Sequence, residues 1–151
     1  MRAGDEGWIH LSGQIVNGEH RLPIRVYYED TDFAGVVYYA NYLKFIERGR
    51  TEALRALGVD QAKLKAAGLV FVVRRVTADW LRPARFDDLL EVRTAVTEVG
   101  GASVRMAQQV LREDAALFRA TVQIACMDEA GRPRRLPAEV RASLLALGEV
   151  G

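Results

Sequence analysis

A chain of 151 residues, half of them hydrophobic, suffices for one domain with a single core and leaves too little for two. Its 21 lysine and arginine residues against 20 aspartate and glutamate residues give a formal charge of +1, which excludes a global field that would draw the protein to nucleic acid or to an anionic membrane. Any anionic ligand must therefore be bound by local charges.

Cysteine and histidine are scarce in the sequence. Cys126 has no partner for an intramolecular disulfide, and His10 and His20 add too few ligands for a zinc site. We therefore expect a reducing, cytoplasmic setting and no bound metal. Because the first residues contain no apolar run long enough for a signal peptide or a membrane span, we expect a short leader or edge segment over residues 1–21, no membrane insertion, and one domain over residues 22–148.

The central stretch predicts a strand, an acidic turn and a long helix. Apolar and polar residues partly alternate over Leu22–Glu29, which is typical of a strand, and residues 30–35 are rich in turn formers. In the helix that follows, the apolar face contains Tyr42, Leu43, Phe45, Ile46, Gly49, Ala53, Leu54 and Leu57. The glycine at position 49 predicts a close approach of another backbone, and Gly58 is expected to cap the helix C-terminus.

The second half of the chain is predicted to be mostly β-structure. A short helical piece over residues 61–68 precedes four stretches with a period of two, which are Val70–Leu81, Leu89–Glu98, Val104–Val110 and Phe118–Cys126. Turn residues at 100–101 and 113–114 indicate that the last three strands are linked by hairpins, and Pro137 is expected to begin a short final helix. The long apolar helix is the only element able to cover such a sheet, so we predict an α+β fold in which an antiparallel sheet wraps one helix.

Residues 27–50 also carry a family signature. The motif Tyr-Tyr-Glu-Asp-Thr-Asp-x-x-Gly-Val-Val-Tyr from Tyr27, followed by Ala-Asn-Tyr and Phe-Ile-Glu-Arg-Gly-Arg-Thr-Glu, resembles that of the 4-hydroxybenzoyl-CoA thioesterase family of hotdog-fold proteins. It is most similar to the acyl-CoA thioesterase subgroup associated with the bacterial Tol-Pal system. The resemblance extends through Phe71-Val-Val-Arg-Arg and Arg82-Pro-Ala-Arg-Phe-Asp-Asp. It therefore covers most of the chain.

The resemblance implies a hotdog fold and a catalytic site around Asp32. It makes Asp32 the catalytic carboxylate, and it gives the backbone N–H near Tyr39, at the helix start, the role of polarising the thioester carbonyl. The chemistry agrees, because unpaired N–H groups and the helix dipole stabilise the negative charge that develops on the carbonyl oxygen. Asp32 would act as a nucleophile, through an acyl-aspartyl anhydride, or as a general base for water, and the sequence leaves both open.

The other carboxylates nearby have simpler expected roles. The family places no chemistry on Glu29 or Asp30, and a turn-forming or structural role is expected for Asp30. Some hotdog enzymes use a carboxylate on the helix instead, for which Glu47 is the candidate. A salt bridge between Glu47 and Arg50, three residues apart, is the simpler expectation.

The resemblance also implies residues that contact the substrate. These are Gly35, Val36, Val37 and Tyr38 beside the catalytic carboxylate, and Val73, Arg74 and Ser103 farther along the chain. Phe33, Val36 and Val37 would line the acyl end of the site. Simple core packing is the alternative for the apolar and aromatic members of this set.

Two departures from the family pattern stand out. Tyr39 occupies the position where close relatives usually have histidine, so an imidazole is absent there while the backbone donor is retained. Many relatives also have a basic residue in the hairpin corresponding to Gly100-Gly101, where the CoA phosphates would pass. Here Ser103 remains as a hydrogen-bond donor, and the cationic contact must come from elsewhere. The candidates are Arg74, Arg75, Arg82 and Arg85, with solvated or interface arginines as the alternative.

The expected function is hydrolysis of an acyl-CoA to a free acid and CoA, with no cofactor beyond the CoA of the substrate. The expected partners are the acyl-CoA and further copies of the chain, because the resemblance implies a dimer or tetramer with sites at the dimer interface. Two alternatives stay open. One is hydrolysis of acyl groups carried on acyl carrier protein, and the other is a non-catalytic scaffold that binds acyl thioesters.

Overall fold

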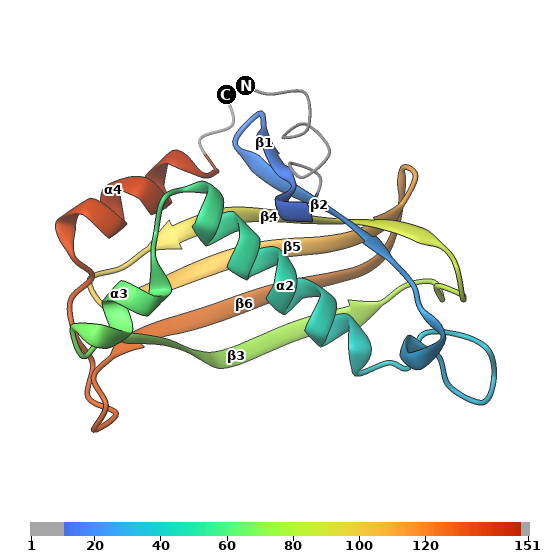
Figure 1. Ribbon diagram of the computed structural model, residues 1–151, viewed down its shortest axis with the longest axis horizontal. Coiled ribbons are helices and arrows are strands. Elements are labelled where there is room, and N and C mark those ends of the chain that lie inside the picture. Colours follow the sequence, from blue (N-terminus) through green and yellow to red (C-terminus); the bar gives the residue numbers. More distant parts are fainter. Residues whose placement is uncertain (1–10, 149–151) are drawn as a thin grey trace.

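The computed structural model describes residues 11–148, which form one antiparallel sheet with helices packed against it (Figure 1). The strands are β1 (Gln14–Val16), β2 (Glu19–Arg25), β3 (Val70–Trp80), β4 (Leu89–Val99), β5 (Ser103–Arg112) and β6 (Ala115–Met127). The helices are α2 (Asn41–Ala56), α3 (Gln61–Ala66) and α4 (Ala138–Ala146), with a 3-10 turn, η1 (Tyr28–Asp30), between β2 and α2. The predicted α+β arrangement is confirmed.

The order of the strands across the sheet is β1-β2-β4-β5-β6-β3. Strands β4, β5 and β6 pair with their neighbours in the chain, which confirms the predicted hairpins. Strand β3 does not pair with β4, its successor in the chain, but with β6, so β3 forms one edge of the sheet. The β1–β2 hairpin forms the other edge, so the sheet includes residues 14–16 and 19–21 of the expected leader or edge segment, while residues 1–10 of that segment lie outside the described residues.

Helix α2 runs along one face of the sheet and supplies the centre of the core (Figure 1). Its buried residues are Asn41, Tyr42, Phe45, Ile46, Gly49, Ala53 and Leu54, which follow the apolar periodicity of the sequence. Two predicted members of this face lie at its margins. Leu43 is 39% exposed and Leu57 is half-buried, because the sheet covers a narrower arc of the helix than the apolar residues span.

Gly49 is required by close packing, although not against a backbone as the sequence suggested. A Cβ atom at Gly49 would lie 2.6 Å from Cγ1 of Val92 and 3.2 Å from Nε2 of Gln108, so side chains of β4 and β5 fill the space beside the helix. The expected cap at Gly58 is confirmed. Gly58 has a φ of +80°, its N–H donates to Arg55 O (3.0 Å), and the next N–H, of Val59, donates to Leu54 O (2.9 Å), which is the Schellman pattern.

The remaining boundaries differ slightly from the predicted ones. The strand predicted over Leu22–Glu29 ends at Arg25, because the carboxylate of Asp30 accepts the N–H of Tyr27 (2.8 Å) and turns the chain into η1. Pro137 precedes α4 as its N-cap rather than beginning it, and Val140 and Leu144 bury the helix against the end of the sheet. Within residues 11–148, no helix combines the length and the apolar character needed to cross a membrane.

Candidate active site

The turn from Asp32 to Val37 holds the predicted catalytic carboxylate. Asp32 Oδ1 accepts hydrogen bonds from the N–H groups of Ala34 (2.9 Å) and Val36 (3.4 Å), and the N–H of Asp32 donates to Val36 O (2.9 Å). Gly35 closes this turn with a φ of +83°, a conformation that side chains disfavour. One carboxylate oxygen therefore fixes the turn, while Oδ2 makes no hydrogen bond to the described residues and faces solvent.

Asp30, two residues earlier, is buried and structural, as expected. Its Oδ2 accepts the N–H of Tyr27 (2.8 Å), its Oδ1 accepts the side-chain amide of Asn41 (3.0 Å), and its carbonyl accepts the N–H of Tyr38 (2.9 Å). Because Asn41 is the first residue of α2, Asp30 ties the acidic turn to the helix start. Both of its carboxylate oxygens are occupied, so it has no free oxygen for chemistry.

Tyr39 lies two residues before α2, between the acidic turn and the helix. Its N–H has no acceptor among residues 11–148, and it lies just before the N-terminal end of α2. Its carbonyl accepts the indole N–H of Trp80 (2.9 Å), and its ring packs edge-on against Trp80 with the centroids 6.0 Å apart. Trp80, at the end of β3, therefore holds the backbone donor in place. No pattern in the sequence indicated this contact.

The loop between β3 and β4 forms the wall behind the acidic turn. The N–H of Val37 donates to Ala84 O (2.8 Å), and the N–H of Ala84 donates to the hydroxyl of Tyr42 (3.0 Å). Tyr42 is buried on α2 and stacks on Phe118 of β6 with the centroids 5.1 Å apart. Burial raises the pKa of the Tyr42 hydroxyl, which is held neutral as a hydrogen-bonding group. The turn, the loop and the helix are thus joined through two backbone groups of one residue.

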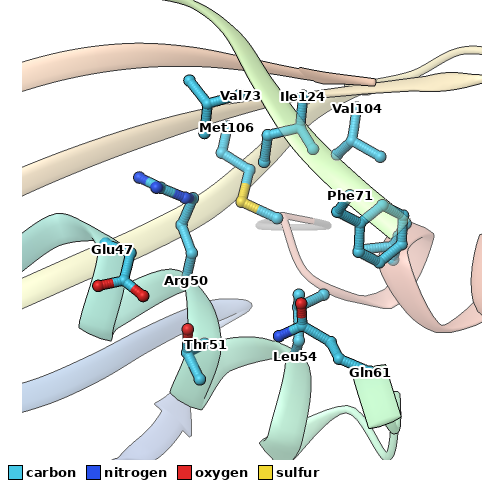
Figure 2. Close-up of a pocket in the computed structure, with 11 residues that line it drawn as sticks. Glu47, Arg50, Thr51, Leu54, Gln61, Phe71, Val73, Val104, Met106 and Ile124 are labelled. Carbon is cyan, nitrogen blue, oxygen red and sulfur yellow. The ribbon is translucent and has the colours of Figure 1, made fainter. Parts of the chain in front are cut away.

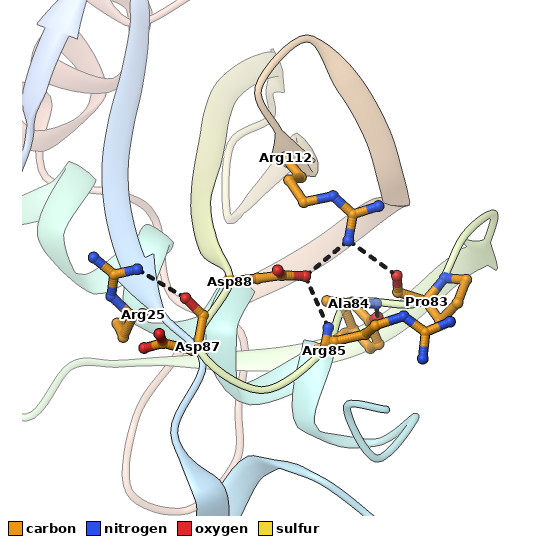
Figure 3. Close-up of polar contacts among 8 residues, drawn as sticks. Arg25, Pro83, Ala84, Arg85, Asp87, Asp88 and Arg112 are labelled. Atoms are coloured by element: carbon orange, nitrogen blue, oxygen red, sulfur yellow. Dashed lines mark hydrogen bonds and ion pairs between the residues drawn. The ribbon is translucent and has the colours of Figure 1, made fainter. Parts of the chain in front are cut away.

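Charged groups hold this loop in place (Figure 3). Asp88 Oδ2 accepts the N–H of Arg85 (2.9 Å) and the guanidinium of Arg112 (2.7 Å). Arg25 Nη1 donates to the carbonyl of Asp87 (2.8 Å). Burial favours a higher pKa for Asp88. The hydrogen bonds from Arg85 and Arg112 and the charges of these two residues outweigh that effect, so the pKa lies below its usual value. The loop is therefore held by an ionised carboxylate.

A cavity of about 190 Å³ opens between α2 and the β3 edge of the sheet (Figure 2). It is lined by Glu47, Arg50, Thr51, Leu54, Gln61, Phe71, Val73, Val104, Met106, Ile124 and Leu144. The polar side chains come from α2 and α3, and the apolar ones come mainly from the sheet. The cavity is therefore an apolar chamber with a polar rim.

The expected salt bridge between Glu47 and Arg50 is wrong. Among the ion pairs of the described residues the two do not meet, and Arg50 Nη1 instead donates to Gln108 Oε1 on β5 (3.0 Å). Gln108 is 1% exposed and also donates through Nε2 to Ile46 O (2.8 Å) and to Thr94 Oγ1 (2.9 Å). Sequence reasoning missed this network. Its signal was a polar glutamine at an inward position of the alternating strand 104–110.

The predicted substrate-binding residues fall into two groups. Gly35, Val36, Val37 and Tyr38 lie in or directly after the turn of Asp32. Val73 lines the cavity, whereas Arg74 sits at a β-bulge and lines a hollow with Arg75, Arg105 and Gln123. This hollow is on the sheet face away from α2, because Gln123 alternates with the buried Val122 and Ile124.

Ser103 belongs to the second group as well. It begins β5 and is aligned through Ala125 of β6 with Val72 of β3. Val73 and Trp80 are seven residues apart on one strand, roughly 23 Å in extended chain. Since Trp80 contacts Tyr39, the turn of Asp32 and the group around Val73 lie toward opposite ends of β3 within one protomer.

Among residues 11–148, His, Cys, Asp and Glu side chains form no group that could hold a metal ion.

Comparison with known proteins shows to which family the chain belongs. The family model of the Thioesterase-like superfamily matches residues 26–144. Over 124 residues the chain is 47% identical to the acyl-CoA thioesterase YbgC of Haemophilus influenzae, covering 81% of this chain and 91% of that protein. It is 44% identical to the acyl-CoA thioester hydrolase YbgC of Escherichia coli, with 81% and 92% covered.

Solved structures agree with this result. A probable thioesterase from Bartonella henselae superposes with a TM-score of 0.75 at 45% identity, covering 79% of this chain and 99% of that one. The fold and the matches define a hotdog-fold thioester hydrolase. The chain belongs to the Thioesterase-like superfamily and, within it, to the YbgC-like subgroup.

Proposed function

We propose that the protein hydrolyses acyl-CoA to a free acid and CoA, with Asp32 as the catalytic carboxylate and the backbone N–H of Tyr39 as the donor to the thioester oxygen. The observation that carries this proposal is the pairing of an exposed carboxylate, fixed through one oxygen, with an unpaired N–H before a long helix. The acyl-CoA activity of the YbgC relatives supports the choice of substrate.

Two courses of reaction fit these groups. In the first, Asp32 Oδ2 attacks the thioester carbon, the C–S bond breaks, CoA leaves as a thiolate that takes up a proton, and water then hydrolyses the acyl-aspartyl anhydride. In the second, Oδ2 takes a proton from water as its oxygen attacks the carbon, and the proton passes to the departing thiolate. In both, the carbonyl oxygen becomes negative, and the N–H of Tyr39 and the positive end of α2 stabilise it.

We infer further that the active unit is a dimer paired along β3. This strand is 11 residues long and forms an edge whose exposed apolar residues include Val72, Val73, Val76 and Trp80. Such an edge needs a partner or a cover. Antiparallel pairing of two β3 strands about a two-fold axis sets the Trp80 end of one protomer beside the Val70 end of the other. Asp32 and Tyr39 would then meet the cavity of the partner.

This arrangement also gives roles to the second group of residues. Val73 would contact the acyl group in the cavity. Contacts of Arg74, Arg75 and Arg105 with the CoA phosphates, and a hydrogen bond from Ser103 to the CoA, stay predictions, and they require the nucleotide to reach the sheet face away from α2. Association of two dimers into a tetramer, a cytoplasmic location and a link to the Tol-Pal system stay predictions.

The test measures thiol release from a panel of short, long and aromatic acyl-CoAs. We expect Asp32→Asn to lower kcat by at least about a hundredfold, because the carboxylate acts directly on the reacting atoms. Glu29→Gln, which removes an exposed charge from the same cluster, is the matched control and should retain turnover. Unchanged turnover in Asp32→Asn would refute the assignment, and a comparable loss in Glu47→Gln alone would move it to the helix carboxylate.

The same panel separates the alternatives. Faster turnover of a matched acyl group on acyl carrier protein would identify that protein, rather than CoA, as the carrier in the substrate. Tight binding of the thioesters with no thiol release would favour a non-catalytic scaffold. Acyl-pantetheine in the panel measures the contribution of the nucleotide. A KM that is no higher for acyl-pantetheine than for acyl-CoA would contradict a phosphate contact at the arginine hollow.

A further inference from the structure

The side-chain amide of Gln108 has one possible orientation. The atom near Ile46 O must be the nitrogen, because a backbone carbonyl only accepts hydrogen bonds, and the same nitrogen reaches Thr94 Oγ1. The amide oxygen therefore faces Arg50 and accepts from its Nη1 at 3.0 Å. Gly49 lies against the same amide, and a Cβ atom there would come within 3.2 Å of Gln108 Nε2, so the helix packs closely on the glutamine. The guanidinium of Arg50 is thus held at the cavity wall by a buried residue.

Most donors of this guanidinium remain free. Arg50 carries five N–H groups, and among residues 11–148 its one hydrogen bond is to Gln108. Figure 2 shows the guanidinium reaching from α2 toward Val73 and Met106 of the sheet, with Glu47 one turn earlier on the same helix. The side chain is partly desolvated, which lowers the pKa of Arg50, and the charge of Glu47 opposes that shift. The cavity therefore contains a fixed guanidinium that has only one of its N–H groups bonded to the described residues.

The neighbouring groups restrict what this donor can bind. A carboxylate on the ligand would be repelled by Glu47, and a plain hydrocarbon would cover the partly desolvated guanidinium without adding an acceptor to that of Gln108. A hydroxyl satisfies both, because it accepts from Arg50 and donates to Glu47. We propose that Arg50, positioned by Gln108, is a specificity-determining residue that makes the enzyme prefer hydroxylated acyl groups over unsubstituted acyl groups of the same length.

The volume of the cavity indicates how large an acyl group fits inside it. Since a cavity of about 150 Å³ holds a benzene ring, a cavity of about 190 Å³ accommodates an acyl group of roughly six to eight carbon atoms. The apolar wall of Phe71, Val104 and Ile124 suits the hydrocarbon part of such a group. This inference rests on the proposed function, since it assigns the cavity to the acyl portion of the substrate.

The experiment compares kcat/KM for hexanoyl-CoA, 3-hydroxyhexanoyl-CoA and 6-hydroxyhexanoyl-CoA. We expect wild type to prefer at least one hydroxylated substrate about tenfold or more, since a site with buried polar groups penalises a ligand that leaves them unpaired. Arg50→Met should abolish the preference, chiefly by lowering kcat/KM for the hydroxylated substrate. Arg55→Met, the same exchange at an exposed position of α2, should leave it intact.

Two further variants keep the test decisive. Glu47→Leu, at an exposed position, should weaken the preference even if Arg50→Met folds poorly. Gln108→Glu keeps an acceptor for Arg50 and should retain more of the preference than Gln108→Met. Equal kcat/KM for all three substrates in wild type, or a preference that survives Arg50→Met, would overturn the inference while leaving thioester hydrolysis intact. Absent thiol release would refute the proposed function, and calorimetric binding of the same three thioesters would then decide the inference.

Discussion

At the scale of single residues, two aspartates in one turn have different roles because of their contacts. Asp30 is buried and has both carboxylate oxygens bonded, one to the backbone of Tyr27 and one to Asn41. Asp32 is exposed and uses only one oxygen to close its turn. Sequence spacing alone does not distinguish the two, since aspartate favours a turn at either position. The free oxygen of Asp32 makes it the stronger candidate for chemistry.

Asp88 leads to a prediction about pH. Its folded-state pKa is lowered, so its ionised form stabilises the fold at pH values above the unfolded pKa of about 3.9 and this contribution is lost as the pH falls through the folded pKa. Asp88→Asn should therefore lower the free energy of unfolding by about 1–2 kcal/mol at pH 7, through weaker bonds to Arg85 and Arg112. Urea unfolding at pH 7 and pH 3 checks this.

The two pH values should give different results. The gap between wild type and Asp88→Asn should shrink at pH 3, where the wild-type carboxyl approaches protonation. Asp87→Asn is the matched control, because its side chain makes no hydrogen bond or ion pair with the described residues, and asparagine tolerates its φ of +70°. A destabilisation by Asp88→Asn that is equal at both pH values would show that charge is not the cause.

At the scale of elements, the packing of α2 on β4 and β5 can be tested at Gly49. Gly49→Ala gains about 1 kcal/mol of helix propensity, but its methyl group would meet Cγ1 of Val92 at 2.6 Å. Valine is stiff about χ1, so relief requires movement of the helix, and overpacking of this kind costs about 1–3 kcal/mol. We expect a net loss of about 1–2 kcal/mol in the free energy of unfolding.

Chemical denaturation of two glycine variants measures this effect. Gly101→Ala is the control, because an added Cβ there meets no atom within 4 Å and the residue has no positive φ. That variant should be near neutral. A stabilised Gly49→Ala would mean that the sheet yields easily to the helix, and it would also weaken the view that Gln108 is held firmly beside Gly49.

The sequence predicts where helices and strands begin and end better than it predicts which of them lie side by side. Periodicity places α2, β4, β5 and β6 to within a few residues, because side chains alternate between core and solvent along each element. The position of β3 at the far edge is not readable in this way, since periodicity carries no information on which strands pair. The network of Arg50 and Gln108 was missed for the same reason. It joins two residues that are distant in sequence and depends on the tertiary packing of α2 on β5.

At the scale of the whole molecule, one protomer separates the groups that the proposed reaction needs. Asp32 and Tyr39 lie at the Trp80 end of β3, and the cavity with Val73 lies toward the Val70 end. A two-fold pairing of β3 strands exchanges these ends, so each site would draw its carboxylate from one protomer and its acyl chamber from the other. Activity should therefore depend on association.

The last prediction concerns Val76, which lies near the middle of β3 and is 37% exposed. Val76→Lys places a charge at the centre of the proposed interface, where two copies would face each other, and should shift the protein from dimer or tetramer toward monomer with loss of thioesterase activity. Ile15→Lys, on the opposite edge strand β1 and 41% exposed, is the control and should retain both. Light scattering after size-exclusion chromatography gives the mass, and thiol release gives the activity. A fully active monomer would refute a site shared between protomers, and a dimer that persists in Val76→Lys would place the interface elsewhere.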